Sequence, residues 1–172
     1  VDACFEKFES EDYLILQNEI NHISYMIDKA YEKGMYIVLN PSPVTESLSE
    51  YPLHKVSLFI LNEVEGNALT GKVQEDDILK ALKETYPQAE ILLTLGEKGC
   101  LYFDGKNLIS QSAYQVKAVD TTAAGDTFTG YFVALRAKGK RVEESLELAS
   151  KAAGIACTRK GAAASVPELS EV

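Results

Sequence analysis

The chain has 172 residues, a length that fits one domain or part of a larger one, and its apolar content of 46% is sufficient for a buried core. The formal net charge of −9 argues against nucleic acids and anionic membranes as partners, so any phosphate ligand has to be held by local dipoles and metal ions. No signal peptide and no apolar run of about eighteen residues is present, and we expect a cytoplasmic protein.

The first half of the chain alternates short apolar runs with helical segments. Residues 13–17, 35–39, 56–61 and 90–94 are apolar runs of the kind found in strands buried on both faces. Residues 21–33, 65–69 and 76–86 are predicted as helices, and Gly71 is predicted to end the second of them as a C-cap. This alternation indicates an α/β fold with a mainly parallel sheet.

The second half begins with shorter strands and ends with two helices. Residues 100–103, 108–111 and 114–119 are predicted as antiparallel strands, with Asp104 and Gly105 forming the first turn. Residues 125–138 and 142–158 are predicted as helices. The three cysteines have no metal-ligand or disulfide spacing, and we expect Cys157 to be a small buried side chain.

The segment 118–132 contains the strongest functional signal. Small residues lead directly into the predicted helix, so the backbone amides of Ala123, Ala124, Gly125 and Asp126 can form an anion site at its positive end. Asp126 carries the wrong charge for holding an anion but is a suitable base, and phosphoryl transfer to a hydroxyl requires both groups. The alternative is an ordinary helix cap and turn.

The same segment resembles the C-terminal signature of the ribokinase-like carbohydrate kinases, the pfkB family, in which Asp-Thr-x-Gly/Ala-Ala-Gly-Asp precedes a helix. The resemblance implies a three-layer α/β/α sandwich. It also implies ATP-dependent phosphorylation of a hydroxymethyl group on ribose or a related sugar. Asp126 would be the base, and the amides of Ala123 to Asp126 would hold the charge on the transferring group.

Asn62 and Glu65 follow the predicted strand 56–61. Ligands gather at the carboxyl ends of parallel strands, and an amide with a carboxylate can order water around Mg²⁺. Capping of the short helix explains the same two residues equally well. The match to the family's Asn-x-x-Glu motif implies that Asn62 approaches the nucleotide phosphates and that Glu65 positions Mg²⁺ through water.

Thr94, Gly96 and Gly99 follow the strand 90–94. Two glycines three residues apart allow close approach of a ligand, although a turn into a hairpin is the simpler explanation. The segment resembles the family's Thr-Leu-Gly-x-x-Gly motif, which implies contacts with the ribose and phosphates of ATP. The glycine pattern of dinucleotide-binding oxidoreductases is missing, so that class is a weak alternative.

The segment 158–167 follows the last helix. Basic side chains stabilise the C-terminus of a helix, which is one explanation for Arg159 and Lys160 at this place. Its Thr-Arg-Lys-Gly-Ala and Ser-Val-Pro strings also resemble the family's loop around a monovalent cation. The resemblance implies a K⁺ site formed, mostly through backbone oxygens, by Asp120, Thr122, Ala156, Arg159, Gly161 and Ser165.

Two further positions concern the substrates. Glu19 follows the first strand and is either a helix-end acid or, by resemblance, a sugar contact. Ser150 stands where some family members have a histidine near the adenine, so the purine contacts of this chain are expected to differ.

Family members are longer than this chain, which resembles their C-terminal portion. We therefore expect one α/β domain over residues 1–172, and an N-terminal portion that grips the sugar, supplies a lid and forms a possible homodimer contact. The alternatives are a nucleotide-binding fragment with little activity, and a kinase acting on fructose, 2-keto-3-deoxygluconate or a nucleoside.

Overall fold

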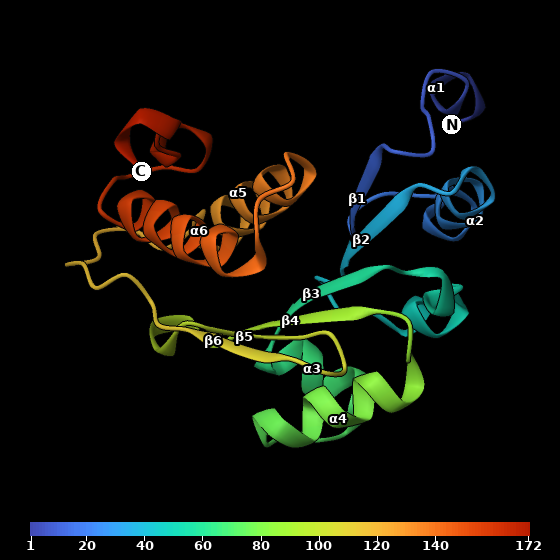
Figure 1. The fold of residues 1–172 in the computed structure, drawn as a ribbon, viewed down its shortest axis with the longest axis horizontal. Helices are drawn as coiled ribbons and strands as arrows, with labels where there is room; N and C mark the ends of the chain where they lie inside the picture. Colours follow the sequence, from blue (N-terminus) through green and yellow to red (C-terminus); the bar gives the residue numbers. More distant parts are fainter. The chain divides into compact units, whose positions relative to one another are not determined.

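The computed structural model describes all residues, 1–172, and its chain divides into two compact units (Figure 1). The first unit comprises Val1–Thr94 and Leu101–Leu108, and the second comprises Leu95–Cys100 and Ile109–Val172. No helix combines the length and the apolar character needed to cross a membrane.

Four strands of the first unit form a parallel sheet. β1 (Tyr13–Gln17) pairs with β2 (Tyr36–Asn40), β2 with β3 (Leu58–Asn62), and β3 with β4 (Glu90–Thr94). In the register Gln17 stands opposite Asn40 and Asn62 stands opposite Thr94. The polar residues that end these strands therefore lie along one edge of the sheet, the edge at which α/β folds bind ligands.

Burial agrees with the expected strands except at the edge of the sheet. β2, β3 and β4 each bury a run of aliphatic or aromatic side chains, as the apolar runs predicted. The prediction for residues 13–17 was wrong in this respect, because Ile15 is 48% exposed and only Leu16 is buried. β1 is the first strand in the sheet order and has a neighbour on one side only.

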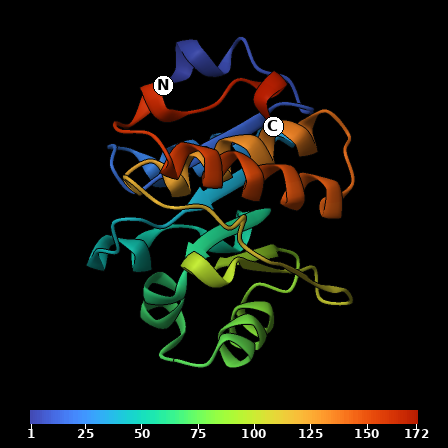
Figure 2. The ribbon, with the colours of Figure 1, turned by 90° about the vertical axis from the view of Figure 1, so that its left-hand side faces the viewer.

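The helices of the first unit follow the strands in sequence. They are α1 (Asp2–Phe5), α2 (Ile23–Lys33), α3 (Glu63–Thr70) and α4 (Glu75–Thr85). α3 and α4 lie side by side against β3 and β4 (Figures 1 and 2). Gly71 ends α3 in the left-handed conformation with a φ of 70°, which confirms the predicted C-cap.

The sheet order continues from β4 to β5 (Cys100–Phe103) and β6 (Leu108–Gln111). These two strands are neighbours in the sheet and are joined by the short connection 104–107, so they form an antiparallel hairpin. Asp104 N donates to Asn107 O at 3.3 Å in the turn, and the backbone amide of Gln111 donates to the Cys100 thiol. The Asp104–Gly105 turn is confirmed: Asp104 Oδ1 accepts from the amides of Lys106 and Asn107, each at 2.7 Å.

The predicted third strand, residues 114–119, was wrong. This segment has no strand partner, and its end is held instead by α6 (Val142–Cys157), because the amide of Val119 donates to the carbonyl of Cys157 at 2.7 Å. Cys157 is also only half-buried rather than buried, since it sits in the last turn of that helix.

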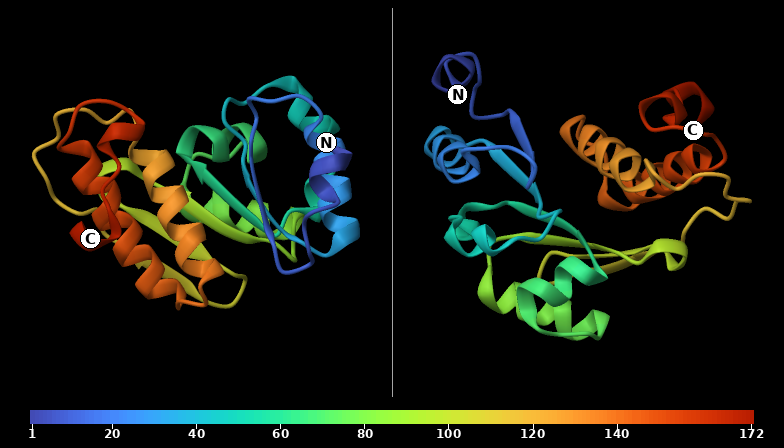
Figure 3. Two further views of the ribbon diagram at one scale, coloured as in Figure 1. Left: turned by 90° about the horizontal axis from the view of Figure 1, so that it is seen from above. Right: turned by 180° about the vertical axis from the view of Figure 1, so that it is seen from behind.

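α5 (Ala124–Ala137) and α6 pack side by side in the second unit (Figure 3). Phe132 on α5 and Leu146 on α6 are fully buried. The chain also contains short 3₁₀ helices at Glu46–Glu50, Leu53–Lys55, Gly96–Lys98, Ala163–Ser165 and Leu169–Glu171. The α/β class and the mainly parallel sheet were therefore predicted correctly.

Candidate functional site

Asp120 connects the segment before α5 with the loop that follows α6. Its Oδ1 accepts from the hydroxyl of Thr122 at 2.6 Å and from the amide of Thr122 at 3.0 Å, and its Oδ2 accepts from the amide of Gly161 at 3.1 Å. The Thr122 hydroxyl, followed by the two amides, lowers the pKa of Asp120. The carboxylate is therefore fixed as an anion, and its hydrogen bonds join Asp120 to Thr122 and Gly161. The K⁺ site itself stays a prediction.

The first turn of α5 is open. No side chain caps the helix at Ala123, Gly125 and Asp126 are exposed, and a Cβ added at Gly125 would have no atom within 4 Å. The first amides of a helix have no partner within the helix, and the macrodipole makes this end positive. Gly125 and Asp126 are therefore exposed at this end, whereas Ala123 is only 6% exposed and the amide of Ala124 donates to the carbonyl of Thr121 at 3.2 Å.

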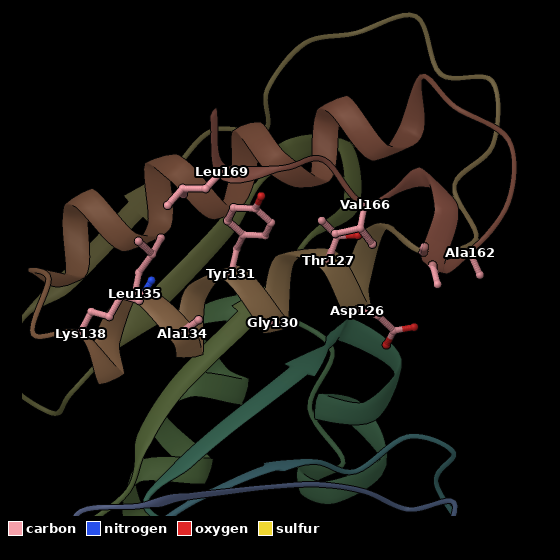
Figure 4. A pocket seen from close by; sticks show the side chains of 12 residues that line it. Asp126, Thr127, Gly130, Tyr131, Ala134, Leu135, Lys138, Ala162, Val166 and Leu169 are labelled. Carbon is pink, nitrogen blue, oxygen red and sulfur yellow. The ribbon is translucent and has the colours of Figure 1, made fainter. Parts of the chain in front are cut away.

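A hollow of about 670 Å³ runs along α5 from this first turn (Figure 4). Asp126 stands at one end of it and Lys138 at the other, with Tyr131 between them. The phenol of Tyr131 donates to the carbonyl of Pro167 at 2.6 Å, which holds the C-terminal segment beside α5. The sequence did not single out Tyr131, because a tyrosine at helical spacing is usually a packing residue.

A second cavity, of about 340 Å³, also includes a residue of this first turn in its lining. Its lining residues include Gly96 and Ala124, two of the predicted ligand contacts, together with Tyr114 and Gly154. Ser150 does not line this cavity: it is 7% exposed and lies one turn earlier on α6. The structure thus brings Gly96 and Ala124 to one cavity and leaves Ser150 outside it.

The structure explains why residue 99 is a glycine without reference to a ligand. The φ of Gly99 is 108°, and a Cβ there would lie 2.0 Å from the carbonyl oxygen of Gln111, so the hairpin itself requires glycine at this position. Gly96 also has a positive φ, 56°, but open space in front of it. Of the two predicted contacts, only Gly96 is accessible to a ligand in the way the prediction supposes.

Asn62 and Glu65 form a reciprocal capping box at the start of α3. The amide of Glu65 donates to Asn62 Oδ1 at 3.0 Å, the amide of Asn62 donates to Glu65 Oε2 at 2.8 Å, and Asn62 Nδ2 donates to Glu65 Oε1 at 3.0 Å. Glu65 is only 6% exposed. Asn62 and Glu65 therefore cap α3, as one of the two interpretations of the sequence expected. Each carboxylate oxygen of Glu65 keeps one further acceptor position for a water molecule.

Thr94 ends β4 directly opposite Asn62 in the register. Its hydroxyl donates to the carbonyl of Leu61 at 3.4 Å, a long and weak hydrogen bond. Asn62, Glu65 and Thr94 thus form one group at the carboxyl edge of the sheet in the first unit, where the sequence placed them.

Glu19 lies in a hollow of about 450 Å³ beyond the end of β1. Its neighbour Asn18 is a residue that sequence reasoning missed. Asn18 Nδ2 donates to Pro43 O at 2.6 Å and to Thr45 Oγ1 at 2.9 Å, and Oδ1 accepts from the phenol of Tyr51 at 2.7 Å. Because these partners are 25 to 33 residues away in the chain, no local pattern could have indicated them.

The remaining residues of the predicted K⁺ site already have protein partners. The carbonyl of Ala156 accepts from the amide of Arg159 at 3.0 Å, and the hydroxyl of Ser165, which is 1% exposed, donates to the carbonyl of Ala162 at 2.7 Å. The guanidinium of Arg159 pairs with Glu171. Carbonyl and hydroxyl oxygens of this kind suit a hard cation, and no cluster of three or more acidic, histidine or cysteine side chains is present.

Comparisons with known proteins agree on one family. The model of the family described as "pfkB family carbohydrate kinase" matches residues 10–169. The chain is 33% identical to the ribokinase of Schizosaccharomyces pombe, covering 100% of this chain and 57% of the relative, and 35% identical to that of Staphylococcus aureus, covering 94% and 55%. It is also 29% identical to the deoxyribokinase of Salmonella typhi, covering 99% and 58%.

Solved structures give the same result. The ribokinase of Arabidopsis thaliana, complexed with ribose and ATP, superposes with a TM-score of 0.85 at 29% identity, covering 99% of this chain and 57% of that one. The ribokinase of Thermotoga maritima has a TM-score of 0.82 at 30% identity, covering 97% and 59%. The fold is therefore ribokinase-like, and the chain spans little more than half the length of the relatives that it matches.

Proposed function

The chain belongs to the pfkB family of carbohydrate kinases, and we propose that it forms the nucleotide-binding and catalytic part of an ATP-dependent kinase that phosphorylates a hydroxymethyl group, with ribose as the leading acceptor. The observation that carries this proposal is the uncapped first turn of α5, which opens beside the exposed carboxylate of Asp126. An anion site next to a base is the arrangement that phosphoryl transfer to an alcohol needs.

Asp126 is the proposed general base. Its carboxylate takes the proton of the acceptor hydroxyl as the oxygen attacks the γ-phosphorus; the bond from that phosphorus to the β–γ bridging oxygen breaks and ADP leaves. A base in this role contributes about 10²–10⁴ in rate. The amides of Ala123, Ala124, Gly125 and Asp126 hold the charge on the transferring group. The absence of a side-chain cap at Ala123 supports this role, although the amide of Ala124 donates to the carbonyl of Thr121 at 3.2 Å within the chain.

The acceptor positions on Glu65 fit a hydrated divalent ion. Glu65 and Asn62 hold each other through three hydrogen bonds, which keeps the carboxylate in one orientation at the edge of the sheet. When bound, Mg²⁺ would neutralise charge on the phosphates of ATP. Glu65 contributes by orienting its waters, and Asn62, Thr94, Gly96 and Gly99 are proposed along the nucleotide, with Gly99 acting mainly through the hairpin.

A K⁺ site behind the first turn of α5 is part of the proposal. Asp120 and Thr122 immediately precede that turn, and Asp120 accepts from the amide of Gly161 in the loop after α6. A cation held there by Asp120, Thr122, Ala156, Arg159, Gly161 and Ser165 would keep the amides of the first turn in place. Glu19 is the proposed sugar contact, and its place in a hollow at the end of β1 supports that role.

A second candidate function is nucleotide binding without sugar turnover. It is favoured by one observation: the chain spans 54–57% of the length of ribokinases that it matches. Without the partner portion that positions the acceptor, up to about 7–11 kcal/mol of the barrier reduction could be lost. A homodimer, a cytoplasmic location and a single domain over residues 1–172 stay predictions.

Calorimetry and a turnover assay separate the two functions. The chain is titrated with ATP·Mg²⁺ and with ribose, and ADP release is followed with ribose, deoxyribose, fructose and nucleosides as acceptors. Turnover with a sugar establishes the kinase and its acceptor. Heat from ATP·Mg²⁺ without turnover establishes the binding function, and no heat from ATP·Mg²⁺ contradicts both.

A further inference from the structure

The cavity of about 340 Å³ beside the first turn of α5 has an aromatic wall that the sequence did not indicate. Half of its twelve lining residues are alanine or glycine, namely Gly96, Ala113, Ala118, Ala124, Ala153 and Gly154. Small side chains explain why a cavity exists there. Tyr114 is its one aromatic lining residue, and its side chain remains 47% exposed.

The position of Tyr114 depends on the absence of a side chain at Gly154. A Cβ added at Gly154 would lie 2.9 Å from Tyr114 Cδ1, 3.0 Å from its Cβ and 3.1 Å from its carbonyl oxygen. Gly154 lies within α6, where glycine costs about 1 kcal/mol relative to alanine, so helix formation does not favour glycine at this position. The close packing of Tyr114 is the structural reason for it.

The segment that carries Tyr114 has little else to hold it. Residues 113–118 have no regular secondary structure. The segment is held at one end by its close approach to Gly99 and at the other by the hydrogen bond from the Val119 amide to the Cys157 carbonyl. The contact with Gly154 lies between these two attachments, so it sets how near the tyrosine ring lies to α6.

We propose that Gly154 and Tyr114 together determine base recognition: Gly154 is the positioning residue, and the ring that it seats against α6 forms the stacking wall for the purine of the nucleotide. This inference rests on the proposed nucleotide-binding function and adds a specificity-determining pair to it. Gly96 and Ala124 line the same cavity, so it also reaches residues proposed as contacts for the phosphates. An aromatic ring is a suitable partner for the face of a base.

Two probes separate base recognition from phosphate recognition. ATP·Mg²⁺ carries a base, and tripolyphosphate·Mg²⁺ carries the same phosphates without one. Stacking of a base on an aromatic side chain contributes about 1–3 kcal/mol, which corresponds to about 5- to 150-fold in affinity. Tyr114→Ala should therefore weaken ATP·Mg²⁺ binding by about tenfold or more in calorimetry and leave tripolyphosphate binding unchanged. Tyr114→Phe, which keeps the ring, should bind ATP as the unchanged chain does.

Gly154→Ala tests the positioning role. The added methyl group displaces the ring, so we expect the same selective loss of ATP affinity without loss of tripolyphosphate affinity. Gly130→Ala is the matched control, since Gly130 is also a helical glycine but a Cβ there meets no atom within 4 Å. It should leave ATP affinity unchanged. Because Gly154→Ala could also lower stability, its melting temperature is measured by circular dichroism.

A tryptophan probe gives an independent readout. The chain contains no tryptophan, so Tyr114→Trp places a single indole in the cavity wall. Its emission should change when ATP·Mg²⁺ is added and stay constant with tripolyphosphate. If ATP binds the unchanged chain but Tyr114→Ala and Gly154→Ala bind it equally well, the inference is overturned while the proposed function stands. If the unchanged chain binds neither probe, both are overturned.

Discussion

Gly99 and Gly96 offer a direct test of whether a glycine is present for the fold or for a ligand. Both have positive φ angles, 108° and 56°, and they stand three residues apart. They differ in their surroundings. A Cβ at Gly99 would lie 2.0 Å from Gln111 O, 2.7 Å from Ala113 N and 2.8 Å from the carbonyl carbon of Ser112, whereas one at Gly96 would meet nothing within 4 Å.

The expected magnitudes follow from these distances. At Gly99 the backbone conformation costs a non-glycine residue about 1–3 kcal/mol, and forcing the neighbouring backbone apart adds about 1–3 kcal/mol. At Gly96 only the left-handed strain of about 1–2 kcal/mol applies. In both variants alanine restricts the unfolded chain, which returns about 0.4–1 kcal/mol. We therefore expect Gly99→Ala to lose about 1–6 kcal/mol of unfolding free energy, with a central value of about 3 kcal/mol, and Gly96→Ala to lose about 0–2 kcal/mol, with a central value of about 1 kcal/mol.

Thermal unfolding followed by circular dichroism measures this difference. For a chain of this size, 1 kcal/mol corresponds to about 2–4 °C. From the central values, Gly99→Ala should melt about 6–12 °C below the unchanged chain, and Gly96→Ala about 2–4 °C below it. Equal melting temperatures for the two variants would refute the argument that the hairpin, rather than a ligand, requires glycine at position 99.

Three further predictions concern Asp126, Asn62 and Asp120. Asp126→Asn should lower kcat of the kinase by at least about 10²-fold while ATP affinity survives, and Glu143→Gln, which changes another exposed first-turn acid, should leave kcat unchanged; a near-normal kcat for Asp126→Asn removes the residue from its role. Asn62→Ala breaks the capping box and leaves Glu65 buried without its partner, so it should cost about 1–3 kcal/mol in urea unfolding, and a cost near zero contradicts the capping role. The folded-state pKa of Asp120 lies below its ordinary 3.8, so its stabilisation is present above pH 3.8 and is lost as the pH falls further; Asp120→Asn should be less stable than the unchanged chain at pH 7, and this gap should narrow below pH 3.8.

Local patterns determined much of this fold. The bounds of β1, β4, β5 and β6 were predicted to the residue, because apolar runs bounded by turn residues are strong signals. Residues 114–119 have the composition of a strand, but their conformation depends on contacts with Gly154 and Cys157, which lie far along the chain.

The site could be predicted only as far as its residues have local signatures. The first turn of α5 and the Asn62–Glu65 pair were both identified from short motifs. At Glu65 the sequence left capping and ligand binding as alternatives, and only the coordinates show the reciprocal capping box and the burial of the carboxylate. The cavity beside Tyr114 was also invisible, because a cavity is formed by what surrounds it and half of its lining residues are alanine or glycine.

The hydrogen bonds of Asn18 have a consequence for selectivity at the end of β1. Both hydrogens of its side-chain amide are donated to the 43–45 turn, and its oxygen accepts from Tyr51. An amide committed in this way has little capacity left to sense the hydroxyl pattern of a sugar. In the proposed sugar-binding role, discrimination would fall to the other polar residues that line the hollow, which include Glu19, Asn21 and His22, and an exchange at one of these positions would leave the hydrogen bonds of Asn18 in place.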